Sequence, residues 1–138
     1  MNKKQKELIL YIVFGVATTA VNWIIYTFLT LVLQAGMTLS NAIAWAGAVL
    51  FAFITNKLFV FESRSMDLGI MLKEALLFVS ARIFSGVFEV FLPTLLVIIG
   101  LNQTLWEIEG FWAKALVSVL VVILNYIVSK MLVFKKKV

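Results

Sequence analysis

Apolar residues fill four long segments of the chain, and polar and charged residues gather in the short stretches between them. The segments are 8–33, 41–61, 75–99 and 111–134. Because about 20 apolar residues of α-helix cross the hydrocarbon core of a bilayer, each segment is long enough to span it. The pattern predicts an all-α integral membrane protein with four transmembrane helices, forming a single domain over residues 1–138.

The composition supports this interpretation. Hydrophobic residues make up 63% of the 138 positions and the mean hydropathy is +1.07, whereas soluble domains are roughly 45–50% apolar. Water therefore cannot be the solvent for most of the chain.

Basic residues cluster where the apolar segments begin or end. The connections 34–40 and 100–110 carry no Lys or Arg, and Glu107 and Glu109 lie in the second one. If four helices alternate, the basic clusters fall on one side of the membrane, and the positive-inside rule predicts that both termini are cytoplasmic. Lys114 is the exception, and the net charge of +5 indicates orientation rather than nucleic-acid binding. The clustered residues are Lys3, Lys4, Lys6, Lys57, Arg64, Lys73, Lys130, Lys135, Lys136 and Lys137.

Several kinds of chemistry are excluded by missing residues. The chain has no His and no Cys, and Asp67 is its only aspartate, so Ser-His-Asp, thiol and zinc sites cannot be assembled. The Gly-x-x-x-x-Gly-Lys-Ser/Thr sequence that cradles nucleotide phosphates is absent as well. We therefore expect a protein that is not an enzyme and needs no metal or cofactor.

Two of the apolar segments end alike. Residues 56–61 and 129–134 both read Lys-x-x-Val-Phe from their second position. This repeat predicts two helical hairpins, 8–61 and 75–134, related by a pseudo-two-fold axis along the membrane normal, the parallel kind of repeat found in some transporters. Phe14 and Phe78 fall at comparable places in the two halves.

Polar residues inside the apolar segments are the candidates for function, because a charge or an amide in hydrocarbon is costly and usually faces a bundle interior or a wet cavity. Their spacings of three and four place those of one segment on one helix face. We expect these faces to line a polar groove. The residues are Thr18, Thr19, Asn22, Asn56, Lys57, Arg82, Ser85, Glu89, Asn125, Ser129 and Lys130.

A purely structural role is open for most of these residues. Lysines at helix ends such as Lys57 and Lys130 commonly extend toward the interface as anchors, and Asn or Thr side chains commonly join helices by hydrogen bonds. Arg82 and Glu89 are different, because a charge at the centre of the bilayer costs at least roughly 2.5–3.5 kcal/mol on insertion scales and needs a partner, water or a ligand.

Four groups of residues, one in each segment, carry a resemblance to a known family. The groups are Phe14-Gly15, Thr18-Thr19 and Asn22; Asn41, Ala44, Trp45, Asn56-Lys57 and Val60-Phe61; Ser80-Ala81-Arg82, Ser85-Gly86 and Glu89; and Asn125-Tyr126, Ser129-Lys130 and Val133-Phe134. Together they resemble the GtrA-like membrane proteins of cell-surface polysaccharide synthesis. The third group is similar to the GtcA-like branch, which is linked to wall teichoic acid glycosylation in Gram-positive bacteria.

The resemblance implies a flippase in the bacterial cytoplasmic membrane. Its substrate would be a sugar on a polyprenyl phosphate carrier, usually undecaprenyl phosphate, and its partners would be polyprenyl-phosphate glycosyltransferases. Many family members carry an acidic residue at the position of Asn22, so no titrating group is implied there. A homo-oligomer is left open.

Our hypothesis for the site follows the chemistry of such a lipid. Lys57, Arg82 and Lys130 bind the phosphate through charge-assisted hydrogen bonds. Amide and carboxylate side chains bind the sugar hydroxyls, and small polar residues line the groove. The sugar-binding or groove-lining residues are Thr18, Thr19, Asn22, Asn56, Glu89, Asn125 and Ser129.

Two other functions are compatible with the sequence. The chain could be a non-transporting partner that positions a polyprenyl-phosphate glycosyltransferase, with its polar faces serving only to pack helices. It could also be a small proton-coupled exporter, which requires a carboxylate in the membrane, and Glu89 is the candidate.

Overall fold

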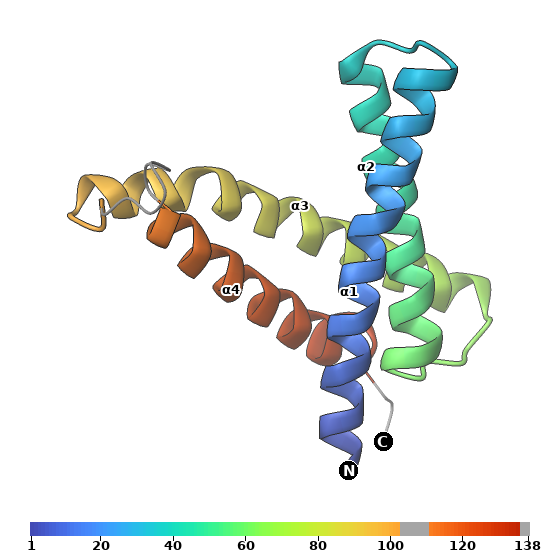
Figure 1. Ribbon diagram of the computed structural model, residues 1–138. Coiled ribbons are helices and arrows are strands. Elements are labelled where there is room, and N and C mark those ends of the chain that lie inside the picture. Colours follow the sequence, from blue (N-terminus) through green and yellow to red (C-terminus); the bar gives the residue numbers. More distant parts are fainter. Residues whose placement is uncertain (103–110, 136–138) are drawn as a thin grey trace. The chain divides into compact units, whose positions relative to one another are not determined.

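The computed structural model describes residues 1–102 and 111–135 and is helical throughout its ordered elements there, with no strand (Figure 1). The α-helices are α1 (Lys3–Thr27), α2 (Met37–Thr55), α3 (Leu68–Ile98) and α4 (Phe111–Val128). Three π-helical turns follow helices in this part of the chain, η1 (Phe28–Val32), η2 (Asn56–Val60) and η3 (Ser129–Val133). Glu107, Glu109, Lys136 and Lys137, which entered the charge argument, lie outside the described residues.

The four predicted spans are confirmed as helices long and apolar enough to cross a membrane. They cover Lys3–Val32, Met37–Val60, Leu68–Ile98 and Trp112–Val133 among the described residues. Large apolar side chains such as Val16, Trp23 and Leu31 are mostly exposed. Exposed apolar surface on this scale is what a lipid-facing helix presents, whereas soluble monomers rarely expose large contiguous apolar patches.

Polar caps start α1 and α3 earlier than the apolar segments begin. The Asn2 side chain accepts a hydrogen bond from the Gln5 backbone N–H (2.9 Å), and the Gln5 side chain accepts one from the Asn2 N–H (3.0 Å). Asp67 accepts from the Ile70 N–H at 3.1 Å. Because such bonds satisfy otherwise orphaned amides of a helix N-terminus, both helices gain polar first turns that a search for apolar runs does not find.

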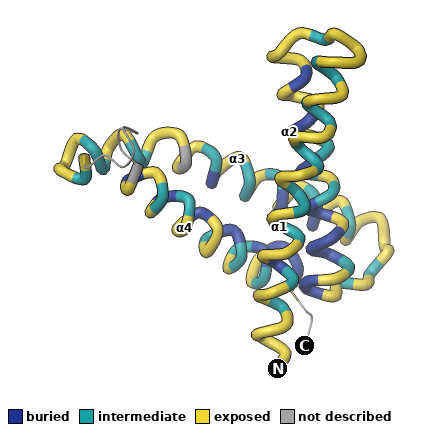
Figure 2. The backbone as a smooth tube through the Cα atoms, viewed as in Figure 1, coloured by how far each residue is buried: buried dark blue, intermediate teal, exposed yellow. Residues whose placement is uncertain are grey.

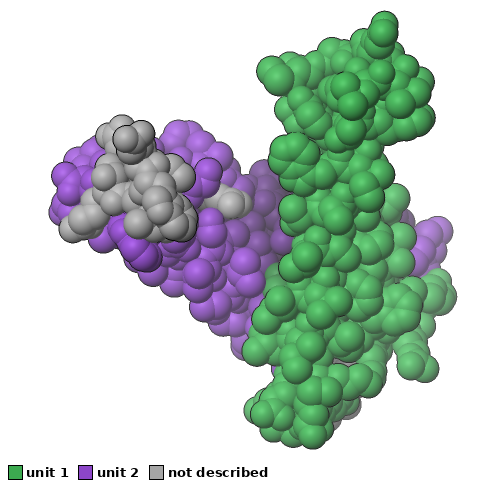
Figure 3. Space-filling view, viewed as in Figure 1, with its two compact units in different colours: residues 1–66 green, residues 67–138 purple. Residues whose placement is uncertain are grey.

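The chain divides into two compact units, unit 1 (Met1–Met66) and unit 2 (Asp67–Val138), and each is described by itself (Figure 3). In unit 1, α1 and α2 form an antiparallel hairpin (Figure 1). The Tyr11 and Phe61 rings lie 6.3 Å apart and the Phe14 and Phe59 rings 5.5 Å apart. These two pairs fix the register of the helices at the end of the hairpin that carries the chain's N-terminus.

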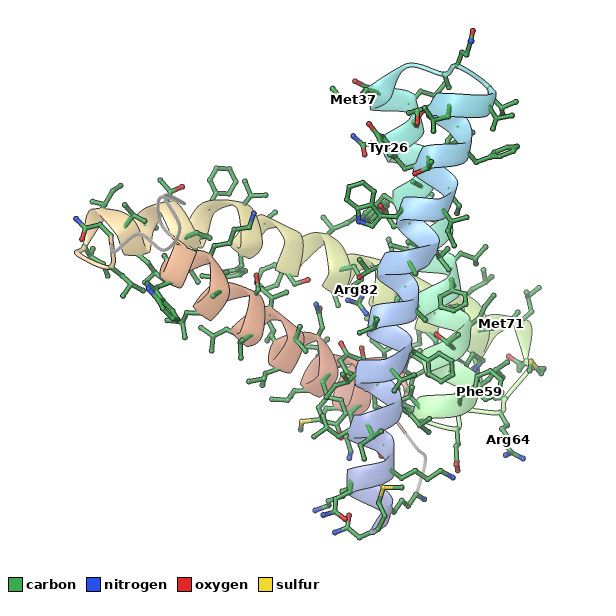
Figure 4. The ribbon with its side chains drawn as sticks, viewed as in Figure 1. Tyr26, Met37, Phe59, Arg64, Met71 and Arg82 are labelled. Atoms are coloured by element: carbon green, nitrogen blue, oxygen red, sulfur yellow. The ribbon has the colours of Figure 1, made fainter. Side chains whose placement is uncertain are left out.

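Basic residues of unit 1 gather at that same end. Tyr26 and Met37 lie at the connected end of the hairpin, and Phe59 and Arg64 lie at the opposite end (Figure 4). The lysines at the start of α1 and Lys57 in η2 share the end that bears Arg64. The charge distribution used for the orientation is therefore present within unit 1, while the cytoplasmic location of this end stays a prediction.

Unit 2 is a second hairpin, formed by α3 and α4, and its chain end is built like that of unit 1. The Phe78 and Phe134 rings lie 6.1 Å apart at 50°, compared with 6.3 Å and 53° for Tyr11 and Phe61. Tyr11, rather than Phe14, is thus the counterpart of Phe78, since Phe14 stacks on Phe59 instead. The pseudo-two-fold axis stays a prediction.

Buried positions on α2 and α4 recur every fourth residue (Figure 2). On α2 they are small, Ala44, Ala48 and Ala52, and small residues let helix backbones approach closely in a membrane. On α4 the same spacing runs through Ala113, Val117 and Val121 and then reaches polar side chains. The buried polar residues of α4 and η3 are Asn125 and Ser129.

Candidate functional site

The segment after α2, which we call the α2 end turn (residues 56–63), opens from α-helix into a π turn. The Phe61 N–H donates to the Asn56 carbonyl at 2.9 Å and the Ser63 N–H to the Lys57 carbonyl at 2.8 Å. Glu62 adopts a positive φ of 50° between them. Single π turns of this kind are uncommon and frequently occur at functional sites.

Lys57 is held inside this turn. Its side chain is only 3% exposed, and its Nζ donates to the Ser63 Oγ at 3.3 Å. A lysine that served only as an interfacial anchor would extend its ammonium into water, whereas this one folds back onto its own turn. The result is a buried positive charge near the C-terminal end of a helix, where the helix dipole favours cations.

Asn56, the neighbour of Lys57, has one satisfied and one unsatisfied side-chain group. Its Nδ2 donates to the Ala52 carbonyl at 2.6 Å. Its Oδ1 is buried and has no hydrogen-bond partner. Water does not reach the residue freely either, since Asn56 is only 3% exposed. Buried polar atoms are almost always paired, so this acceptor is a candidate for binding a donor that arrives from outside.

The α4 end turn (residues 129–134) repeats the backbone of the first but holds its lysine differently. The Phe134 N–H donates to the Ser129 carbonyl at 2.9 Å. Lys130 Nζ donates to the Tyr126 hydroxyl at 3.4 Å and lies 5.6 Å from the centre of the Tyr126 ring. Lys130 is half-buried. The two lysines of the repeated pattern therefore lie in similar turns but have different partners, Ser63 for Lys57 and Tyr126 for Lys130.

Arg82 lies at the same end of unit 2 as the α4 end turn. Its guanidinium carbon lies 5.0 Å from the centre of the Phe78 ring. Arg82 is one turn beyond Phe78 on α3, and Lys130 is one turn before Phe134 on the antiparallel helix. Since Phe78 packs on Phe134, the two cations occupy the same level of this hairpin, which the sequence analysis did not anticipate.

The polar face predicted on α1 is mostly satisfied within its own helix. The Thr18 hydroxyl donates to the Phe14 carbonyl at 2.7 Å and the Thr19 hydroxyl to the Gly15 carbonyl at 3.3 Å. Asn22 is half-buried. With Tyr11 beside Phe61, antiparallel counting places Asn22 opposite residue 50, roughly 9 Å along the helix from the level of Asn56 at about 1.5 Å per residue.

The candidate residues therefore form one group in each unit. Asn56 and Lys57 share the α2 end turn. Arg82 and Lys130 share a level in unit 2, and Asn125 lies on α4 about one turn before Lys130. The side chain of Glu89 lies outside the described residues. A common site made from both groups stays a prediction. Among the residues that the structure describes, no three acidic, histidine or cysteine side chains come together to hold a metal ion.

Three residues that hold the cations were missed by sequence reasoning. They are Ser63, Phe78 and Tyr126. Two of them carried a readable signal, since an aromatic residue lies four positions before both Lys130 and Arg82 and so shares a helix face with the cation. Ser63 gave no such signal, because its approach to Lys57 depends on the positive φ at Glu62.

Comparisons with known proteins cover nearly the whole chain. Residues 10–134 match the family model described as the GtrA/DPMS transmembrane domain. The chain is 38% identical over 130 residues to the uncharacterized membrane protein YwcD of Bacillus subtilis (strain 168), covering 92% of this chain and 95% of the relative.

Two further relatives carry the name cell wall teichoic acid glycosylation protein GtcA. The protein of Listeria monocytogenes serovar 1/2a is 35% identical over 131 residues, covering 95% of this chain and 86% of its own. That of Listeria innocua serovar 6a is 35% identical over 129 residues, covering 94% and 85%. No solved structure matches significantly.

Proposed function

Since the chain belongs to the GtrA/DPMS transmembrane domain family, we propose that it translocates a sugar linked to a polyprenyl phosphate carrier across the bacterial cytoplasmic membrane. The carrier is proposed to be undecaprenyl phosphate. The two Listeria relatives are named for cell wall teichoic acid glycosylation, and we assign the transported sugar to glycosylation of teichoic acid or another cell-surface polysaccharide. Polyprenyl-phosphate glycosyltransferases are the proposed pathway partners.

The physical task of such a protein suits a small helical chain. The polyprenyl tail stays in hydrocarbon throughout, so only the phosphate and the sugar need shelter from lipid. A phosphate is bound well by charge-assisted hydrogen bonds from Lys and Arg. Lys57, Arg82 and Lys130 are the proposed phosphate ligands. The sugar hydroxyls are assigned to Asn22, Asn56, Asn125 and Glu89, with Thr18, Thr19 and Ser129 around them.

One observation carries the proposal: the buried Lys57, at 3% exposure, lies next to the orphaned Oδ1 of Asn56 at the end of a membrane-spanning helix. A buried acceptor without a partner costs free energy unless a donor pairs with it, and a buried lysine can add an anionic ligand to the partners it already has. A ligand with an anionic group beside hydroxyl donors matches both at once, and a glycosyl phosphate is such a ligand.

Flipping by the purified chain tests the proposal. Proteoliposomes would hold a fluorescent polyprenyl-phosphate sugar, and a membrane-impermeant quencher would report how fast label leaves the outer leaflet. Lys57→Ala and Arg82→Ala each remove a charge-assisted hydrogen bond of roughly 1.5–3 kcal/mol, so we expect at least about a tenfold slower exchange at limiting lipid. Lys3→Ala, which removes an exposed charge in the first turn of α1, is the matched control.

If both variants flipped the lipid at the wild-type rate, the proposed phosphate site would be wrong. Absence of flipping by the wild-type chain, together with co-purification of a polyprenyl-phosphate glycosyltransferase, would favour the positioning partner instead.

A further inference from the structure

The unpaired side-chain oxygen of Asn56 accepts hydrogen bonds, whereas the neighbouring ammonium of Lys57 donates them, so the two groups select different parts of a ligand. Nδ2 lies 2.6 Å from the Ala52 carbonyl, and exchanging the amide's nitrogen and oxygen would bring two oxygens to that distance. The amide orientation is therefore fixed by this contact. Oδ1 is consequently the group left without a partner.

An acceptor of this kind can be satisfied only by an O–H or N–H donor. The two lipids that pass through the proposed pathway differ in that respect. A bare polyprenyl phosphate is a monoester with a charge of about −1.5 to −2 near neutral pH, so most of its phosphate oxygens are acceptors. A sugar-bearing carrier is a phosphodiester with a single negative charge, so its phosphate still attracts a lysine, and its sugar adds several hydroxyl donors.

We propose that Asn56 is the residue by which this protein distinguishes the sugar-bearing carrier from the bare carrier, an inference that rests on the proposed function. Lys57 attracts the phosphate of either lipid. Asn56 Oδ1 accepts a hydrogen bond from a sugar hydroxyl, and the bare carrier leaves it unpaired. Sites built to bond a substrate hydroxyl reject the analogue without it for this reason.

Access to Oδ1 requires the side chains that cover it to move, because the atom is buried in the ligand-free protein. Pairing a previously unpaired acceptor favours that rearrangement. The direction of the preference matters for the proposed transport, since a flippase that kept hold of bare carrier would be occupied by the lipid from which the sugar has already been removed.

Binding measurements on the full-length protein in lipid nanodiscs test this inference. Native mass spectrometry would compare a polyprenyl phosphate, the same lipid with a hexose on its phosphate, and that glycolipid with all sugar hydroxyls methylated. We expect roughly tenfold tighter binding of the hydroxylated glycolipid than of the bare lipid, by the usual effect of one unpaired buried acceptor. The methylated probe, which has no donors, should lose that advantage without any mutation.

The variant Asn56→Leu should bind both lipids about equally, with the loss confined to the glycolipid. Its removal of Nδ2 leaves the Ala52 carbonyl with hydrogen bonds from the Asn56 backbone N–H and the Thr55 hydroxyl. Thr55→Val is the matched control, because Thr55 is buried in the adjacent position and bonds the same carbonyl. We expect the wild-type preference in that control.

Equal binding of the hydroxylated and methylated glycolipids by the wild-type protein would overturn the role of Asn56. A preference that Asn56→Leu leaves unchanged would overturn it as well. These results leave the proposed function standing, because both lipids still bind. Failure of the wild-type protein to bind any of the three lipids would instead overturn the proposed function, and the inference with it.

Discussion

Arg82 lies with its guanidinium carbon 5.0 Å from the centre of the Phe78 ring, one helical turn away on α3. Phe78 is 1% exposed, and its ring also packs on Phe134. A cation within about 6 Å of an aromatic face is attracted by the ring's quadrupole. One buried ring thus packs the end of the α3–α4 hairpin and holds the half-buried Arg82 at that end.

Replacing Phe78 by leucine tests this double role. Phe78→Leu keeps an apolar side chain but removes the ring face, so Arg82 loses a cation–π contact of roughly 0.5–2 kcal/mol. We expect flipping to slow by about 2- to 30-fold, measured in the proteoliposome assay. Phe84→Leu, at a residue 60% exposed on the same helix, should keep the wild-type rate, and an equal loss in both variants would contradict the role given to Phe78.

Tyr126 offers Lys130 both a hydroxyl and a ring, and two variants separate them. The hydroxyl contact of 3.4 Å is long for a hydrogen bond, so Tyr126→Phe should slow flipping less than the loss of a well-formed bond to a charged group, which is worth roughly 1.5–3 kcal/mol or at least about tenfold. Tyr126→Leu also removes the ring and should cost more. If Tyr126→Phe alone were as damaging as Tyr126→Leu, the hydroxyl would be the decisive group.

Gly47 marks a close approach of α2 to α1. A Cβ built on it would lie 2.5 Å from the Cδ1 of Ile25. Gly47→Leu should therefore destabilise the protein by about 1–3 kcal/mol through overpacking, measured by thermal unfolding in detergent. Combining it with Ile25→Ala should restore part of the loss, because the colliding methyl is gone. Gly86→Ala, which meets nothing within 4 Å, is the control and should not destabilise.

The orientation inferred from the basic residues can be checked because the chain has no cysteine. Thr38 and Met66 are both exposed and lie in or next to connections at opposite ends of the unit 1 hairpin. A membrane-impermeant maleimide added to intact cells should label the Thr38→Cys variant and should label Met66→Cys only after permeabilisation. The reverse pattern would place both termini outside.

The helical spans could be predicted from the sequence because apolar length alone decides whether a helix can cross a bilayer. The first residues of α1 and α3 could not be predicted in that way. Asn2 and Asp67 extend the N-terminal ends of these helices through hydrogen bonds rather than through hydrophobicity. Both copies of the repeated Lys-x-x-Val-Phe pattern lie in π turns at helix ends, while the pseudo-two-fold axis that the pattern suggested stays a prediction. Their π geometry was not foreseeable, because an i→i+5 bond leaves no signature in residue type.

The helical placement of the candidate residues could be predicted from the sequence, and their contacts could not. Asn56, Lys57, Arg82 and Lys130 all lie in helix segments as expected. The choice of Tyr11 over Phe14 as the ring against Phe61 depends on packing, because both aromatics stand three residues apart on nearly the same face. The orphaned oxygen of Asn56 depends on its amide nitrogen bonding back to Ala52, and a sequence does not say which of two groups on one amide will be satisfied.

The two end turns also constrain how the chain length can vary. The backbone N–H of Phe61 donates to the Asn56 carbonyl, and that of Phe134 to the Ser129 carbonyl. Each bond spans five residues instead of the four of an α-helix. Deleting one residue inside either turn would allow ordinary helix to form, yet it would swing the terminal phenylalanine by about 100° around the axis, away from Tyr11 or Phe78. Natural relatives should therefore gain or lose residues in the connections and hardly ever between Asn56 and Phe61 or between Ser129 and Phe134.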